Sequence, residues 1–134
     1  MRGNSRYKFR AWNKRTSKMY NVLSIFFNHK VARLQRLNGG IKSFLEQFDD
    51  IILMQYTGID DKNGSGIFEK DIVKIEVDDG FDYIDSVGFV DWHEREREYA
   101  VFLKGEPWRR LSIEDEVEVI GNIYENPELL GEEE

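Results

Sequence analysis

The stretch from Leu53 to Lys74 constrains the fold more than any other part of the sequence. An apolar run ends at Tyr56 and an alternating apolar run opens at Asp71, with three glycines between them. The pair Asn63-Gly64 is typical of tight turns, because asparagine and glycine tolerate positive φ better than other residues. The pattern predicts two strands joined through a hairpin-like corner, whose structural residues are Gly58, Asn63, Gly64 and Asp71.

Period-two patterns predict further strands on both sides of this corner. In residues 6–12, Tyr7, Phe9 and Ala11 point to one side and their neighbours to the other. A second strand over 19–27 makes the N-terminus a hairpin. Later strands are expected over residues 51–56, 71–77, 86–92, 99–103 and 116–124.

Three details of the C-terminal half are also predicted. Gly88 is expected at a bulge or sharp bend, because glycine weakens a strand interior. Asn126-Pro127 is expected to start a short helical turn that runs through Leu130. The last strand is expected to bury Val117, Val119, Ile123 and Tyr124.

Residues 28–48 follow a different spacing. Val31, Leu34 and Leu37 recur at every third position with cations between them, as on a short amphipathic helix. Gly39-Gly40 ends this pattern. Helical spacing then resumes for about two turns, at Ile41, Phe44, Leu45 and Phe48. Two short helical stretches are expected here.

The expected fold is mainly β with a minor helical part. Short strands spaced about 10–15 residues apart predict a small closed or half-closed barrel. We expect an N-terminal hairpin and a partly helical segment over residues 1–50, then the barrel over 51–134. A chain of 134 residues is typical of one domain, so both parts are expected to form one compact unit.

The net charge of −7 is divided unevenly along the chain. Residues 1–48 carry eleven lysines and arginines against one acid, Glu46, a net charge of +10. Residues 49–134 carry eight lysines and arginines against 25 acids, a net charge of −17. The basic half either faces a nucleic acid or is neutralised by the acidic half, within one molecule or across an oligomer.

The sequence excludes several classes of protein. It has no cysteine, so disulfides and thiolate metal sites are impossible. No apolar run approaches the length of a membrane-spanning helix, and the first residues lack the apolar region of a signal peptide. We therefore expect a cytoplasmic protein that does not bind membranes.

Candidate metal and catalytic motifs are weak. Asp61, Asn63 and Ser65 match the first half of a calcium loop, but the twelfth position is Ile72 rather than glutamate. A hairpin corner explains the same residues. His29 and His93 are the only histidines and are interpreted as surface residues. We predict no catalytic residue, no metal and no cofactor.

The strongest candidate surface combines cations with an indole. Cations beside an aromatic ring suit phosphate contact and base stacking. Alternatively, the indole packs against the barrel and the cations face the acidic half. The candidate residues are Arg6, Lys8, Arg10 and Trp12 on one strand face, with Lys14, Arg15 and Lys18 in the following turn.

Four segments also resemble a known family. They are Lys8–Trp12 with Lys18-Met19, Leu53–Gly58 with Asp61–Gly64, Ile67–Val73, and Glu118–Leu130. In this order they are similar to the YopX family of phage and prophage proteins. The resemblance implies an SH3-like β-barrel for the C-terminal part and a phage or prophage origin. It implies no reaction, because the biochemical role of the family is not established.

One position departs from the family pattern. Lys70 stands where the family usually has glycine, so the local turn must accommodate a Cβ atom. From the expected fold and this resemblance, we expect a non-enzymatic protein-interaction or assembly module that forms a homo-oligomer. The alternative is a nucleic-acid-associated accessory protein that uses the basic N-terminal strand. The fold alone does not choose between these functions.

Overall fold

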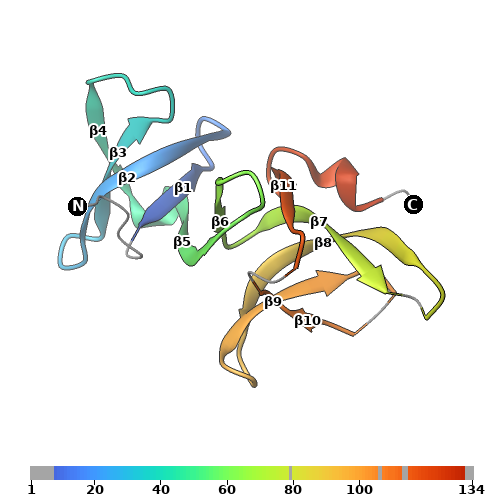
Figure 1. The fold of residues 1–134 in the computed structure, drawn as a ribbon. Helices are drawn as coiled ribbons and strands as arrows, with labels where there is room; N and C mark the ends of the chain where they lie inside the picture. The colour runs from blue at the N-terminus through green and yellow to red at the C-terminus, as the bar shows by residue number, and fades with distance from the viewer. Residues whose placement is uncertain (1–7, 79, 106, 113–114, 132–134) are drawn as a thin grey trace. The chain divides into compact units, whose positions relative to one another are not determined.

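The computed structural model describes residues 8–78, 80–105, 107–112 and 115–131. It divides into two compact units, Met1–Tyr56 and Thr57–Glu134, which are described separately below. The described residues form antiparallel strands and two 3₁₀ turns, with no α-helix (Figure 1).

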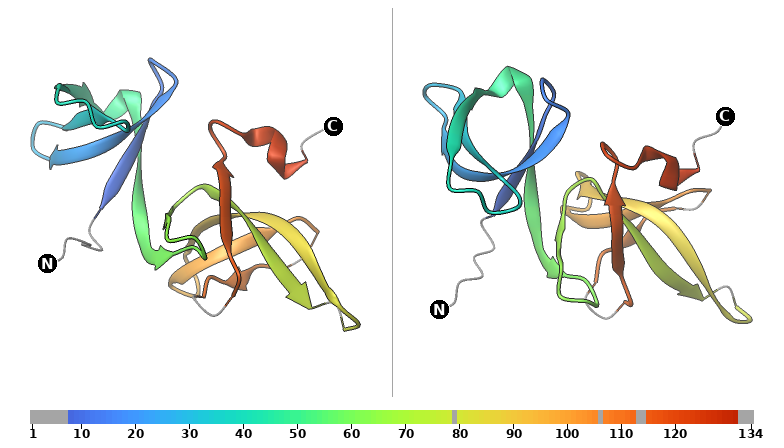
Figure 2. Two further views of the ribbon diagram at one scale, coloured as in Figure 1. Left: turned by 45° about the horizontal axis from the view of Figure 1, so that its top comes forward. Right: turned by 90° about the horizontal axis from the view of Figure 1, so that it is seen from above.

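The first unit is built from four strands and the start of a fifth. The β1–β2 hairpin is confirmed, with Trp12 opposite Met19, and β5 pairs with the other edge of β1. The strand order is β4-β3-β2-β1-β5, and these strands curl rather than lie flat (Figure 2). The elements are β1 (Phe9–Asn13), β2 (Lys18–Phe26), β3 (Val31–Arg36), β4 (Ser43–Gln47), η1 (Phe48–Asp50) and β5 (Ile51–Asp60).

The predicted helices over residues 28–48 are wrong. This segment forms β3 and β4, which pair antiparallel with each other, and β3 also pairs with β2. Ala32 and Leu34 are both fully buried, so the apolar period is two rather than three. Leu37, expected on the buried helical face, is exposed, and Gly39 forms the connecting turn with a φ of 85°.

Small and aromatic side chains from all five strands fill the core of the first unit. Its buried centre comprises Ala11, Tyr20, Ala32, Leu34 and Ile51, with Val22, Phe44, Phe48 and Leu53 packed against it. Because each strand contributes alternate residues, the core requires the antiparallel register that the turns impose.

The central corner is a tight turn at the end of β5. This strand runs through Gly58, which has a φ of 90°, and β6 (Gly66–Phe68) returns beside it. Between them, the Gly64 N–H donates to the carbonyl of Asp61 at 3.0 Å, and Gly64 has a φ of 87°. Lys70 also adopts a positive φ, 73°, so this turn holds a Cβ in a conformation that favours glycine.

The second unit contains a five-stranded antiparallel sheet. The order is β10-β9-β8-β7-β11, so the last strand pairs with the first strand of the sheet. No closed barrel is found among the described residues, which form two open sheets of six and five strands. The elements are β7 (Asp71–Asp78), β8 (Tyr83–His93), β9 (Glu98–Leu103), β10 (Arg109–Arg110), β11 (Glu118–Asn122) and η2 (Pro127–Leu130).

The alternation predicted for β7 is present. Val73, Ile75 and Val77 are buried and enter the core of the second unit. The predicted bulge at Gly88 is wrong, because β8 keeps regular pairing there with both β7 and β9. A Cβ at this position would lie 2.5 Å from the Phe102 carbonyl oxygen, so the glycine permits close approach of two strands.

The closing segment is partly buried. Val117 is buried, whereas Val119, Ile123 and Tyr124 are only half-buried, because β11 lies at the edge of the sheet. The β11–β7 register shifts between Val119 and Gly121. The predicted turn after Asn126 is the 3₁₀ turn η2, with Pro127 in its first positions. Among the described residues, no helix is long and apolar enough to cross a membrane.

Candidate functional site

The structure places the described members of the predicted basic and aromatic set on and beside β1 and at the β1–β2 turn. Lys14 and Lys18 are exposed in and beside the β1–β2 turn, and Arg10 and Trp12 are half-buried on β1. The Lys8 ammonium lies 4.4 Å from the centre of the Tyr56 ring, a cation–π contact within the first unit. Arg6 lies outside the described residues.

Arg15 forms an ion pair with Glu46 of the same unit. Its guanidinium donates to both carboxylate oxygens of Glu46, at 2.8 Å and 3.4 Å. The buried amide of Asn13 donates to the same carboxylate at 3.0 Å. The hydrogen bond from Arg15 lowers the pKa of Glu46; burial opposes this effect and the Asn13 amide adds to it. Of the four cations in residues 8–15, Lys8 and Arg15 therefore have structural roles.

The corner residues surround a buried carboxylate. Oδ1 of Asp61 accepts the backbone N–H groups of Asn63 and Ser65, each at 2.9 Å, and Oδ2 accepts that of Val119, also at 2.9 Å. Burial raises the pKa of Asp61, but the three hydrogen bonds outweigh burial, and the net shift is downward. Asp71 likewise accepts the Phe68 N–H at 2.8 Å. The Asp61 carboxylate therefore links the turn to β11, and this set of three hydrogen bonds is called the clasp here.

A second cluster of rings was not predicted as a site. Trp92 and His93 end β8, Phe102 lies on β9, and Trp108 immediately precedes β10. These residues, together with Glu94, Arg95 and Glu96 from the β8–β9 turn, line a hollow of about 500 Å³, here called the aromatic groove. All seven belong to the second unit.

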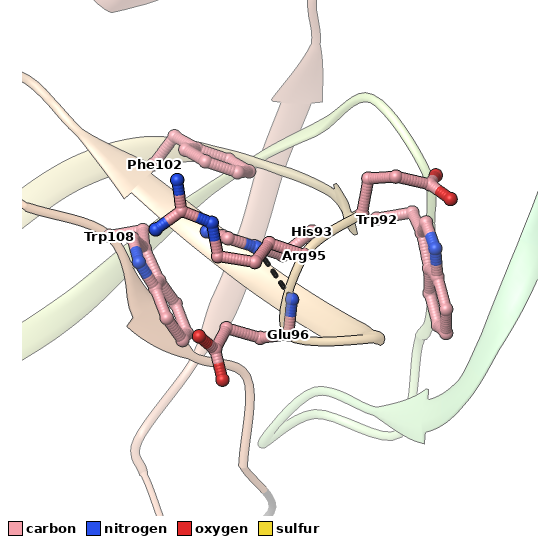
Figure 3. Close-up of a pocket in the computed structure, with 7 residues that line it drawn as sticks. Trp92, His93, Arg95, Glu96, Phe102 and Trp108 are labelled. Carbon is pink, nitrogen blue, oxygen red and sulfur yellow. Dashed lines mark hydrogen bonds between the residues drawn. The ribbon is translucent and has the colours of Figure 1, made fainter.

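His93 is the centre of the aromatic groove. Its ring lies 4.3 Å from Trp108, centre to centre, and 6.0 Å from Phe102, with which it is nearly parallel. Its Nδ1 accepts the backbone N–H of Glu96 at 3.1 Å, so the neutral ring carries its proton on Nε2. Figure 3 shows Trp108 facing His93, whereas Trp92 points to the other side of the turn.

Packing outside the groove supports its rings. Phe102 also stacks on Phe89 at 5.3 Å, and Trp92 meets Tyr99 edge to face at 5.0 Å. Burial, together with the nearby Glu69 carboxylate, raises the pKa of the Tyr99 hydroxyl, which donates to Glu69 at 3.1 Å. The rings are therefore held before any ligand arrives.

The chemistry of the groove favours binding. Aromatic faces offer apolar contact, and the lining adds the carboxylates of Glu94 and Glu96 and the guanidinium of Arg95. No group of three or more potential metal ligands occurs in the described part of the chain. Sequence reasoning missed the groove because it interpreted His93 as a surface residue. The available signal was Trp92-His93 before the β8–β9 turn and Trp108 after the next strand.

Comparison with known proteins identifies relatives of the whole fold. The family model described as YopX protein matches residues 8–131. The crystal structure of protein EF1440 from Enterococcus faecalis is similar, with 28% sequence identity and a TM-score of 0.59. The similarity covers 92% of this chain and 96% of that chain. A comparison with curated proteins gave no match. Because the family model spans nearly the whole described fold, this chain belongs to the YopX family.

Proposed function

We propose that this protein is a non-enzymatic interaction module whose aromatic groove binds an extended, proline-containing peptide with a basic residue. The observation that carries the proposal is the set of rings held around His93, with Trp108 at 4.3 Å and Phe102 at 6.0 Å. Such a surface suits proline, because polyproline II segments present rings and have no internal hydrogen bonds to lose.

The negative charge of the second unit is the reason for proposing a basic residue in the peptide. Thr57–Glu134 carries 23 acids and eight lysines and arginines, a net charge of −15. At the groove itself, Glu94 and Glu96 add two carboxylates against the one guanidinium of Arg95. A cationic peptide is therefore attracted to this unit, whereas a nucleic acid is repelled.

The wider proposal follows the resemblance to phage proteins. We place the protein in the cytoplasm of a bacterial host, encoded by a phage or prophage. The five-stranded sheet is proposed to be an SH3-like barrel, which is supported by the pairing of its last strand with its first. The proposal of a binding role, rather than an enzymatic one, rests on the chemistry of the groove.

The proposal is tested with a short labelled peptide that contains two Pro-x-x-Pro repeats and one arginine. We expect saturable binding by fluorescence anisotropy. Trp108→Ala should weaken binding roughly tenfold or more, the loss typical of an aromatic anchor at a binding surface. Trp12→Ala is the matched control, because Trp12 lies on β1 in the first unit.

Backbone NMR shifts locate the contact. Shifts confined to the β8–β9 turn and Trp108 support the proposal. Equal binding of a peptide with the same charge but no proline would contradict the proposed ligand. Failure of the proline peptide to bind, together with shifts at Lys14 and Lys18 on addition of an oligonucleotide, would instead favour the nucleic-acid function.

A further inference from the structure

The first unit contains a second hollow, which the peptide-binding proposal does not use. It has a volume of about 510 Å³ and is called the β3–β4 hollow here. The rings of Tyr20 and Phe44 meet edge to face at 5.2 Å in it. The remaining lining residues come from the end of β3, the following loop and the start of β4: Arg36, Gly40, Ile41, Lys42 and Ser43.

Hydrogen bonds hold the loop that forms this hollow. The Gln35 side chain donates to the Gly40 carbonyl at 2.6 Å, and the Gly39 N–H donates to the Arg36 carbonyl at 3.2 Å. Arg33 donates to the Ser43 hydroxyl at 3.2 Å on the opposite strand. The β3–β4 hollow is therefore formed in the isolated chain, and binding does not have to create it.

The lining of the hollow combines apolar surface with cations. Ile41 is 94% exposed and lines the hollow, so the hollow presents an apolar side chain to solvent. Arg36 and Lys42 are exposed on either side, and neither forms an ion pair with a described residue. An occupant must therefore combine apolar side chains with carboxylates.

The β7–β8 turn of the second unit, a name used here to include Tyr83, Ile84 and Asp85 at the start of β8, has this composition. Phe81 is 97% exposed and Tyr83 is 66% exposed, with Ile84 exposed beside them. Exposed aspartates flank these side chains, at Asp82 and Asp85. Within the described residues of the turn, the Asp82 carboxylate accepts the Tyr83 N–H at 2.8 Å. A projecting turn with rings and carboxylates complements a hollow with rings and cations.

We propose that the β3–β4 hollow of one molecule binds the β7–β8 turn of a second copy. The two surfaces differ, so the contact is head to tail and produces a ring or an open chain rather than a symmetric dimer. The net charges of the units support this pairing, at +8 for Met1–Tyr56 and −15 for Thr57–Glu134. The inference is independent of the aromatic groove and of its peptide.

The test uses charge reversal on each side of the contact. The double variant Arg36→Glu/Lys42→Glu alters the hollow, and Asp82→Lys/Asp85→Lys alters the turn. Light scattering should show that wild type associates with increasing concentration and dissociates with added salt. Each variant should associate at least about tenfold more weakly, because like charges then face each other.

Mixing the two variants provides the decisive measurement. The hollow and the turn of the first variant are both acidic at the changed positions, and those of the second variant are both basic, so opposite charges face each other only between different variants. The mixture should therefore associate more strongly than either variant alone. Association of the mixture also shows that both variants fold. The control Lys14→Glu/Lys18→Glu, which changes exposed cations elsewhere in the first unit, should associate like wild type.

Three outcomes would overturn the proposal. The first is a wild type that stays monomeric at all concentrations, and the second is a mixture of variants that associates no more strongly than each variant alone. The third is equal loss of association in the Lys14→Glu/Lys18→Glu control, which would indicate general charge attraction. Binding of a labelled oligonucleotide by monomeric wild type, abolished by Arg36→Glu/Lys42→Glu, would assign the β3–β4 hollow to a polyanion.

Discussion

Removal of the Asp61 carboxylate should unfold the clasp that joins the central corner to β11. Its two oxygens accept the N–H groups of Asn63, Ser65 and Val119, each at 2.9 Å. Asp61→Ala leaves all three donors without this acceptor. The first two lie in an exposed turn and can be hydrated, whereas Val119 is half-buried on the last strand.

The expected loss follows from these three hydrogen bonds. A hydrogen bond to a charged group contributes roughly 1.5–3 kcal/mol, and less where water replaces the partner. We therefore expect the free energy of unfolding to fall by about 3 kcal/mol, most of it from the Val119 contact. Asp78→Ala is the matched control, because Asp78 accepts the Gly80 N–H at 2.9 Å in an exposed turn. It should cost under about 1 kcal/mol.

The contribution of Asp61 should also depend on pH. Its pKa is lower in the folded chain than its usual value, so the unfolded chain binds a proton more readily. The stabilisation is therefore fully present above the unfolded pKa of about 3.9 and is lost as pH falls through the folded pKa. The difference between wild type and Asp61→Ala should shrink over this acidic window.

Urea unfolding measures these differences. In a Trp12→Phe background the remaining tryptophans, Trp92 and Trp108, both report on the second unit. A loss of stability in Asp61→Ala no greater than that in Asp78→Ala at neutral pH would refute this role of Asp61. So would a difference between Asp61→Ala and wild type that is the same at neutral pH and at pH values below about 3.9.

Three further changes give distinct outcomes. Gly88→Ala should lower the free energy of unfolding by roughly 2–3 kcal/mol, because its Cβ would meet a backbone carbonyl at 2.5 Å. Gly64→Ala should lower it by only about 1 kcal/mol, because the new Cβ meets no atom within 4 Å and only the positive φ is unfavourable. Equal losses for the two variants in thermal unfolding would contradict this difference. Glu46→Gln should lower the free energy of unfolding of the first unit by about 1–2 kcal/mol at neutral pH, an effect that urea unfolding should find weaker below the carboxylate pKa. Fragment 1–116 should lose cooperative unfolding of the second unit, because it lacks β11. An unchanged calorimetric transition would show that the second unit folds without that strand.

Several strands were predictable because the alternation of their apolar and polar residues fits only an extended conformation. In β7, Val73, Ile75 and Val77 alternate with polar residues, and only a strand puts all three on one face. Asn63-Gly64 similarly required a turn, since its glycine takes a φ of 87°. The two-stranded N-terminal hairpin follows from the same local logic.

The helices predicted over residues 28–48 failed for a physical reason. An interval of three between apolar residues, over two turns, does not distinguish a helix from a strand that carries one small buried residue. Ala32 is that residue, fully buried between Val31 and Arg33. Pairing with β2 and β4 makes this segment a strand, and the local sequence pattern carries no information about these pairing partners.

The candidate sites depended on contacts between distant residues. Sequence alone identified the basic N-terminal segment, but not that Arg15 pairs with Glu46, 31 positions away. It also identified the corner that brings Asp61 close to Val119, 58 positions away, without predicting their hydrogen bond. The aromatic groove arises because antiparallel pairing of β8, β9 and β10 places His93, Phe102 and Trp108 side by side. Local periodicity determines which face of a strand is apolar, whereas only strand pairing determines which side chains meet across a sheet.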